Sequence, residues 1–325
     1  MTLLFISFLI TLSVLGGSIM LALMSARLRK RALPFLSGSP SSYFTDHSLY
    51  RFIGIPLDVL GVLYYVFVAV LASMFFTEGG VSWGVLFFVL LFGSLFSLYM
   101  LLVQIVAVKS YCEWSFIALT IPIIALGGAL LSVPADQVSA WIVENISELH
   151  LLMVIMAAAG VALSTVSFFV FMTFMEDMRL SSYELQALSV LSEGAWISVV
   201  GFFTASISLV WVTESIPDIQ SLSFLMGVML VIAVCEFVKL TRIRPAFVWV
   251  FLKRGEQSTE ERGLLKRLAF GVEGLTFVSW LCVALFLLVF DNLSVAYMSG
   301  VYILIIAVSV LLSQLVRTRF HDDSL

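Results

Sequence analysis

The stretch WGVLFFVLLFGSLFSLYMLLVQIVA, residues 83–107, contains no charged side chain and is long enough to cross a membrane as a single helix. About 20 apolar residues in a helix span the roughly 30 Å of hydrocarbon in a bilayer. Eight further runs are also long and predominantly apolar. We therefore expect nine membrane helices, at about 3–24, 54–76, 83–107, 114–133, 149–175, 192–213, 221–238, 268–290 and 296–316.

The composition agrees with this interpretation. Apolar residues make up 61% of the chain and charged residues only 12%, with a mean hydropathy of +1.11. A water-soluble domain has about a quarter of its residues charged. The sequence also contains no Gly-rich phosphate loop, no nucleophile elbow and no metal-ligand pair. It shows no basic, aromatic-interleaved stretch, so we expect no nucleic-acid partner. The fold class predicted here is an all-α integral membrane protein.

The loop charges predict an orientation. If the nine predicted helices cross the membrane in alternating directions, all 17 Lys and Arg lie on one side of it. They are in the loops 25–51, 108–112, 176–190 and 239–267 and in the C-terminal tail. The loops of the opposite face carry only acids, which are Glu78, Asp136, Glu144, Glu148, Glu214, Asp218 and Asp291. Lys and Arg mark the cytoplasmic side of a membrane protein. We expect the N-terminus outside and the C-terminus inside, with membrane lipids around the helices.

A polar stretch from Pro134 to Ser147 divides the chain. We expect a four-helix transmembrane domain at 1–133 and a five-helix transmembrane domain of unknown role at 148–325. No internal repeat relates the two.

Among the three cysteines, Cys112 has the context of a reactive thiol. It lies at the mouth of the fourth predicted helix, and Lys109 precedes it by three residues. A helix N-terminus and a nearby cation both favour the thiolate. Cys235 and Cys282 lie inside apolar runs and are interpreted as packing residues.

A series of short motifs runs through the first four predicted helices. They are Ser48-Leu49-Tyr50, Gly54-Ile55-Pro56, Leu60-Gly61, Tyr64-Tyr65, then Tyr99, Gln104 and Cys112. Together they resemble the vitamin K epoxide reductase family of membrane thiol–quinone oxidoreductases, over about residues 5–133. The resemblance implies a four-helix bundle of that family, followed here by the five-helix membrane bundle.

The resemblance also implies a site and a cofactor. A quinone (ubiquinone, menaquinone or similar) would lie near Tyr64, Tyr65 and Gln104, and Cys112 and Ser48 would be catalytic. Electrons would come from a thiol–disulfide partner protein. The sequence departs from the family where the second helix-four cysteine is Ser115 and a loop cysteine is Ser42. The other loop cysteine would fall near Leu36 or Ser37.

These departures leave the function open between two classes. The first is a thiol–disulfide/quinone oxidoreductase impaired in redox turnover, because a mixed disulfide needs a second thiol to resolve it. The loss of cysteines can be natural or engineered. The second is a non-catalytic quinone- or lipid-binding protein, or a cation transporter. We expect a prokaryotic plasma membrane, with Cys112 on the cytoplasmic face by charge, whereas the family resemblance implies the outer face.

Three acids lie one to two turns inside the membrane from the basic face, namely Glu193, Glu236 and Glu273. Ionisable groups at such a depth are commonly functional, which suggests a proton or cation role. The alternative is structural: Glu193 and Glu273 occupy early helical turns, and Lys239 or Lys266 can pair with these acids.

Overall fold

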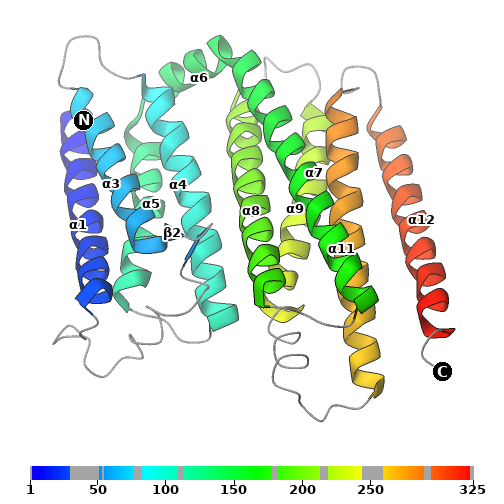
Figure 1. Cartoon of the computed structure of the whole chain (residues 1–325). Coiled ribbons are helices and arrows are strands. Elements are labelled where there is room, and N and C mark those ends of the chain that lie inside the picture. Colours follow the sequence, from blue (N-terminus) through cyan, green and yellow to red (C-terminus); the bar gives the residue numbers. More distant parts are fainter. Residues whose placement is uncertain are drawn as a thin grey trace. The chain divides into compact units, whose positions relative to one another are not determined.

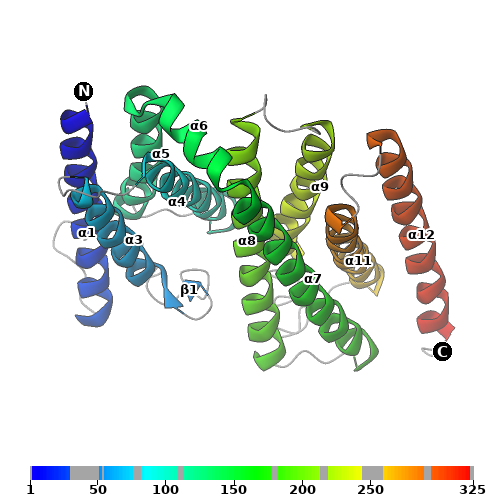
Figure 2. The ribbon, with the colours of Figure 1, turned by 90° about the horizontal axis from the view of Figure 1, so that it is seen from above.

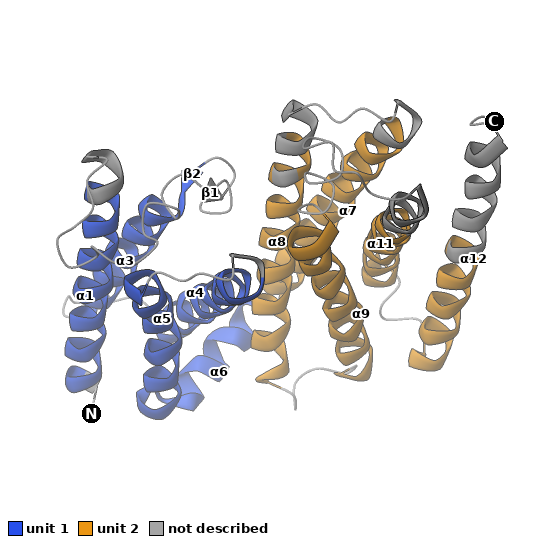
Figure 3. Ribbon diagram, turned by 90° about the horizontal axis from the view of Figure 1, so that it is seen from below, with its two compact units in different colours: residues 1–146 blue, residues 147–325 orange. Residues whose placement is uncertain are grey.

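The computed structural model describes residues 2–29, 51–52, 55–75, 82–108, 113–177, 182–212, 219–243, 259–288 and 294–322. The chain forms two compact units, residues 1–146 and 147–325, coloured separately in Figure 3. Within the described residues, every element is helical apart from one short hairpin, which confirms the all-α fold.

The first unit is a bundle of four long helices with a fifth, short helix at one end (Figure 1). The helices are α1 Thr2–Arg29, α3 Leu57–Met74, α4 Trp83–Val103, α5 Glu113–Ser132 and α6 Ala135–Glu144. A π-helical turn, η3 Gln104–Val108, continues α4. Helix α1 packs against α3 and α5, and α4 packs against α5 and α6.

The short hairpin leads into α3. Strand β1 Arg51–Phe52 pairs antiparallel with β2 Ile55–Pro56, in the register Arg51 with Pro56 and Phe52 with Ile55. Pro56 then caps the start of α3 in an extended conformation. Proline suits this position because it has no N–H to leave unpaired in the first turn. The sequence placed the start of this helix at about 54, so the hairpin shortens it by one turn.

Helix α6 occupies the polar stretch that the sequence suggested as a divider. Val138 and Ile142 are its buried face, one turn apart. Trp141 packs against α4 at Gly84, where an added Cβ would lie 2.3 Å from the indole ring. Position 84 therefore requires glycine, and α6 belongs to the first unit.

The core of the first unit consists of apolar side chains from all four long helices. Its buried members are Phe5, Ile6, Leu9, Val68, Leu71, Ala72, Leu86, Leu90, Ala125 and Ala129. Its small members, Ala72 of α3 and Ala125 and Ala129 of α5, let the helices approach closely. Other apolar side chains, such as Leu63, Phe67 and Val70 on α3, face outward. An apolar outer surface is what a lipid environment requires.

The second unit contains α7 Ile146–Asp177, α8 Ser182–Val210, α9 Ile219–Val238, α11 Thr259–Leu288 and α12 Val295–Asp322, with a π-helical turn η5 Lys239–Ile243 after α9. Helix α9 packs against α8, α11 and α12, and α11 also packs against α12 (Figure 2). Helices α7 and α11 meet where Gly160 receives the ring of Trp280 at 2.4 Å from an added Cβ.

Eight helices among the described residues are long and apolar enough to cross a membrane, so the chain is an integral membrane protein. The spans are Leu3–Ser25, Leu57–Met74, Trp83–Val106, Glu113–Ser132, Ile146–Thr173, Val190–Val210, Ile219–Ile243 and Leu268–Leu288. The ninth predicted span corresponds to α12, whose apolar described stretch, Val295–Ser309, is shorter. A ninth crossing and the orientation of the chain stay predictions.

Candidate functional site

Two of the residues singled out from the sequence contact each other in the first unit. Gln104 begins η3 and is 1% exposed, and Ser115 lies in the first turn of α5 and is 5% exposed. The amide Nε2 of Gln104 donates a hydrogen bond of 2.9 Å to the hydroxyl of Ser115. A π-helical turn inserts an extra residue into a helix and often marks a functional site. Here it begins at Gln104, whose side chain binds Ser115, the serine that the sequence resemblance predicts to stand at a cysteine position.

The other end of the Gln104 amide has no such partner. Its Oε1 is buried and makes no hydrogen bond to any described residue. Which end of an amide is oxygen is assigned from the hydrogen-bond network. In either assignment, one end of the amide binds Ser115. The other end, which we call its open end, has no hydrogen-bond partner among the described residues. A buried polar atom without a partner costs about 1–3 kcal/mol, so this position favours a polar ligand atom.

The hydroxyl of Tyr65 is used within the bundle. It donates a hydrogen bond to the carbonyl oxygen of Ala118 on α5. In a regular helix that carbonyl would accept from the N–H of residue 122, but Pro122 has none. Tyr65 replaces the missing donor. Its ring also lies on Gly16 of α1, where an added Cβ would come within 2.3 Å of it. Tyr65 thus joins α1, α3 and α5.

Tyr64 points elsewhere. Its hydroxyl oxygen is buried and has no hydrogen-bond partner among the described residues. It lies against Gly93 of α4, where an added Cβ would be 2.2 Å from it. Gly93 precedes Gln104 by eleven residues, or about 16 Å along a helix. The buried polar atoms of Tyr64 and Gln104 that have no partner among the described residues therefore lie at two different levels of the bundle.

A further polar link between α4 and α5 escaped the sequence analysis. The hydroxyl of Ser94 lies 2.7 Å from the carbonyl of Leu90 and 2.8 Å from that of Pro122. Proline inside an apolar helix was the signal that could have revealed it, because proline disturbs the carbonyls around it. Tyr99, also named from the sequence, is buried on α4 with its ring 6.2 Å from that of Phe96.

Three predicted site residues lie outside the described residues. They are Cys112, Ser42 and Ser48, and the predicted neighbour Lys109 is outside as well. Their roles stay predictions. Ser115, Gln104, Tyr64 and Tyr65 are the predicted site residues whose surroundings can be examined.

The first unit is thus a small helical membrane domain with a buried polar site. That site is the amide–hydroxyl pair between the end of α4 and the start of α5. Residues 7–130 match the model of the vitamin K epoxide reductase family. The first unit is therefore a membrane domain of that family, which is generally linked to quinones. A comparison with curated proteins and one with solved structures gave no match.

Proposed function

We propose that the first unit is a thiol–quinone oxidoreductase domain whose internal dithiol relay is interrupted at Ser115. The family membership supports the oxidoreductase class. The hydrogen bond from Gln104 to Ser115 carries the rest of the proposal, because it gives the serine at the second cysteine position a stable partner. Cys112, three residues earlier, would be the thiol nearest the quinone.

The chemistry explains why the serine matters. Two thiols release two electrons and two protons as their disulfide forms, and a mixed disulfide is resolved by a second thiolate. A serine hydroxyl neither attacks a disulfide under these conditions nor forms one. Cys112 alone would need a thiol from a partner protein or a small thiol to complete each cycle. The domain would thus be a half-site that depends on its partner.

The described residues fit a quinone in part. The group, when bound, supplies an acceptor for two electrons and two protons. The open end of the Gln104 amide would hold one of its polar atoms, since that end is buried and without a partner among the described residues. The Tyr64 hydroxyl is also buried and without such a partner, but it lies at another level of the bundle and would contact a different part of the bound molecule. The hydroxyl of Tyr65 is occupied by Ala118, so Tyr65 would contribute its ring and not a hydrogen bond. The surrounding apolar side chains would exclude water.

A second function is supported by the same contact. A serine with a satisfied hydrogen bond at a redox position also suits a domain that binds a quinone or another lipid without chemistry. The two functions differ in whether Cys112 passes electrons to quinone.

The test is a stoichiometric reaction without an external thiol. Purified, pre-reduced Ser115→Cys protein is mixed with excess quinone, and quinol formation is followed by absorbance. The disulfide between Cys112 and the thiol introduced at position 115 is followed by mass after alkylation. Residues three apart at a helix start lie on one face and can approach disulfide distance. We expect about one quinol and one disulfide per protein molecule.

The matched controls are the unmodified protein and the double variant Cys112→Ala, Ser115→Cys, both expected to form no quinol. A Ser115→Cys variant that forms neither disulfide nor quinol would remove the oxidoreductase proposal and favour the binding function. Repeated Cys112-dependent turnovers by the unmodified protein, with a dithiol donor and no added protein, would show that the missing cysteines are not needed.

A further inference from the structure

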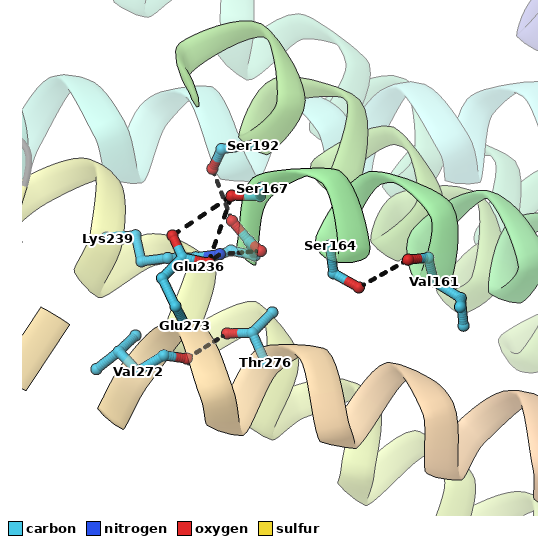
Figure 4. Close-up of polar contacts among 9 residues, drawn as sticks. All are labelled: Val161, Ser164, Ser167, Ser192, Glu236, Lys239, Val272, Glu273 and Thr276. Atoms are coloured by element: carbon cyan, nitrogen blue, oxygen red, sulfur yellow. Dashed lines mark hydrogen bonds and ion pairs between the residues drawn. The ribbon is translucent and has the colours of Figure 1, made fainter. Parts of the chain in front are cut away.

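The second unit contains a buried cluster of charge that the quinone chemistry does not use. Lys239 in η5 lies between two carboxylates, with Nζ 2.6 Å from Oε1 of Glu236 and 3.1 Å from Oε2 of Glu273 (Figure 4). We call Glu236, Lys239 and Glu273 the Lys239 triad. Glu236 and Glu273 come from α9 and α11, so the triad joins two helices of the unit.

The triad is enclosed by protein. The side chains of Glu236, Lys239 and Glu273 are 1%, 3% and 10% exposed. All three lie inside the candidate spans Ile219–Ile243 and Leu268–Leu288. At this depth neither bulk water nor lipid stabilises an ion, and an uncompensated charge is costly.

The formal charges of the triad do not cancel. Two carboxylates and one ammonium leave one negative charge if all three are ionised. Ser192 of α8 and Ser167 of α7 contribute hydroxyls but no charge. Glu193 and Cys235 are the titratable side chains adjacent in sequence to Ser192 and Glu236. Neither supplies a positive charge, and Arg242, one turn after Lys239, is exposed. Among the described side chains, Lys239 is the cation that pairs with these carboxylates.

The two carboxylates are not equivalent. Glu236 has a short contact on each oxygen, since Lys239 lies 2.6 Å from Oε1 and the Ser192 hydroxyl donates to Oε2 at 2.6 Å. Glu273 has the longer 3.1 Å contact with Lys239, and the Ser167 hydroxyl lies 3.4 and 3.5 Å from its two oxygens. Strong hydrogen bonds to a charged carboxylate measure about 2.5–2.7 Å from a hydroxyl. Glu236 therefore has the shorter, stronger contacts, and the contacts of Glu273 are longer.

An apolar layer separates the triad from one end of the unit. Phe171, Ile243 and Ala269 are buried against one another. Phe171 follows Ser167 by one turn on α7, Ile243 follows Lys239 by one turn on η5, and Ala269 precedes Glu273 by one turn on α11. All three therefore lie on the side where α9 and η5 end and α11 begins.

We propose that the Lys239 triad is a proton-binding site of the second unit, with Glu236 and Lys239 as a permanent ion pair and one exchangeable proton held at Glu273. The proton brings the net charge of the triad to zero. A metal ion fits less well, because the Lys239 ammonium already occupies the space between the carboxylates. In addition, no three His, Cys, Asp or Glu side chains gather as metal ligands in the part of the chain that the structure describes.

The test is infrared spectroscopy of the purified full-length protein at neutral pH. Exposed carboxyl groups are ionised there, so a protonated-carboxyl carbonyl band, shifted in D₂O, reports a buried acid that keeps its proton. We expect such a band in the unmodified protein and its loss in Glu273→Gln. We also expect its loss in Glu236→Gln, because Glu273 and Lys239 then balance each other. Glu148→Gln, an exposed acid at the start of α7, is the control and should keep the band.

Several results would overturn the proposal. A spectrum of the unmodified protein without the band would mean that the triad is fully ionised. A band that persists in Glu273→Gln would come from another residue, and one that persists in Glu236→Gln would not depend on charge balance. A band seen in N-methylglucamine chloride but lost in sodium or potassium chloride would assign the site to an alkali-metal ion. Circular dichroism and size-exclusion chromatography would establish that each variant is folded.

Discussion

The hydroxyl of Tyr65 on α3 donates a hydrogen bond to the carbonyl of Ala118 on α5, the same carbonyl that Pro122 leaves without its helical donor. A local defect in one helix is thus repaired by a side chain of another. In a bilayer this repair is important, because no water is available to hydrogen-bond the carbonyl.

The first prediction follows from this contact. Tyr65→Phe keeps the ring on Gly16 but leaves the Ala118 carbonyl unpaired, so it should lower the free energy of unfolding by about 1–3 kcal/mol. In a Pro122→Ala background the N–H of residue 122 supplies the donor, and Tyr65→Phe should cost clearly less. Denaturation in detergent micelles, as a double-mutant cycle, measures the difference. Equal costs in the two backgrounds would contradict the proposed repair.

The second prediction concerns the packing of the Tyr65 ring against Gly16. An alanine methyl at position 16 would lie 2.3 Å from the ring, whereas position 127 has no atom within 4 Å of an added Cβ. Gly16→Ala should therefore destabilise the first unit by about 1–3 kcal/mol through overpacking. Gly127→Ala is the matched control and should be neutral or slightly stabilising, since alanine favours a helix. Thermal unfolding compares the two, and similar melting temperatures would argue against this packing.

The third prediction tests the open end of the Gln104 amide. If it holds a polar atom of a bound quinone, Gln104→Ala should reduce the affinity about tenfold, the equivalent of one hydrogen bond of about 1.4 kcal/mol. Quinone extracted per molecule of purified protein, and titration with added quinone, measure the effect. Gln137→Ala, at an exposed position on α6, should retain wild-type affinity. Unchanged quinone content in Gln104→Ala would exclude Gln104 from the site.

The fourth prediction concerns orientation. The sequence predicts that all 17 Lys and Arg lie on one face, and this predicts a cytoplasmic position for Cys112. A membrane-impermeant maleimide should label Cys112 in inside-out vesicles and not in intact cells. Cys112→Ser is the control for labelling at Cys235 and Cys282, which are both buried. Labelling of Cys112 in intact cells would place it on the outer face, as the family resemblance implies.

Several structural features were predictable because they depend only on local sequence. The stretch 83–107 has enough uncharged length to cross a membrane, and the structure places α4 and η3 there. The same reasoning gave the other seven confirmed spans to within a few residues at most ends. A larger difference is α8, which begins at Ser182, ten residues before the predicted span, because a helix can extend beyond the membrane where the sequence becomes polar.

The family motifs identified Gln104 and Ser115 separately, but their contact depends on how α4, which the π-helical turn η3 continues, packs against α5. No periodicity in the sequence predicts a π-helical turn. The geometry around Cys112 stays a prediction, because that residue lies outside the described part of the chain.

The sequence by itself determined that this protein lies in a membrane, where its helices are, and the family of its first unit. The length of an apolar run and a short motif are both properties of contiguous residues. Only the tertiary structure decided which polar groups meet. Along the chain, Lys239 and Lys266 were both possible partners of the membrane acids. The packing of α9 against α11 brought Lys239 between Glu236 and Glu273, which are 37 residues apart. Pairing of this kind depends on which faces of two helices are in contact. Those faces are chosen by the fit of many apolar side chains at once, and no single stretch of sequence contains that information.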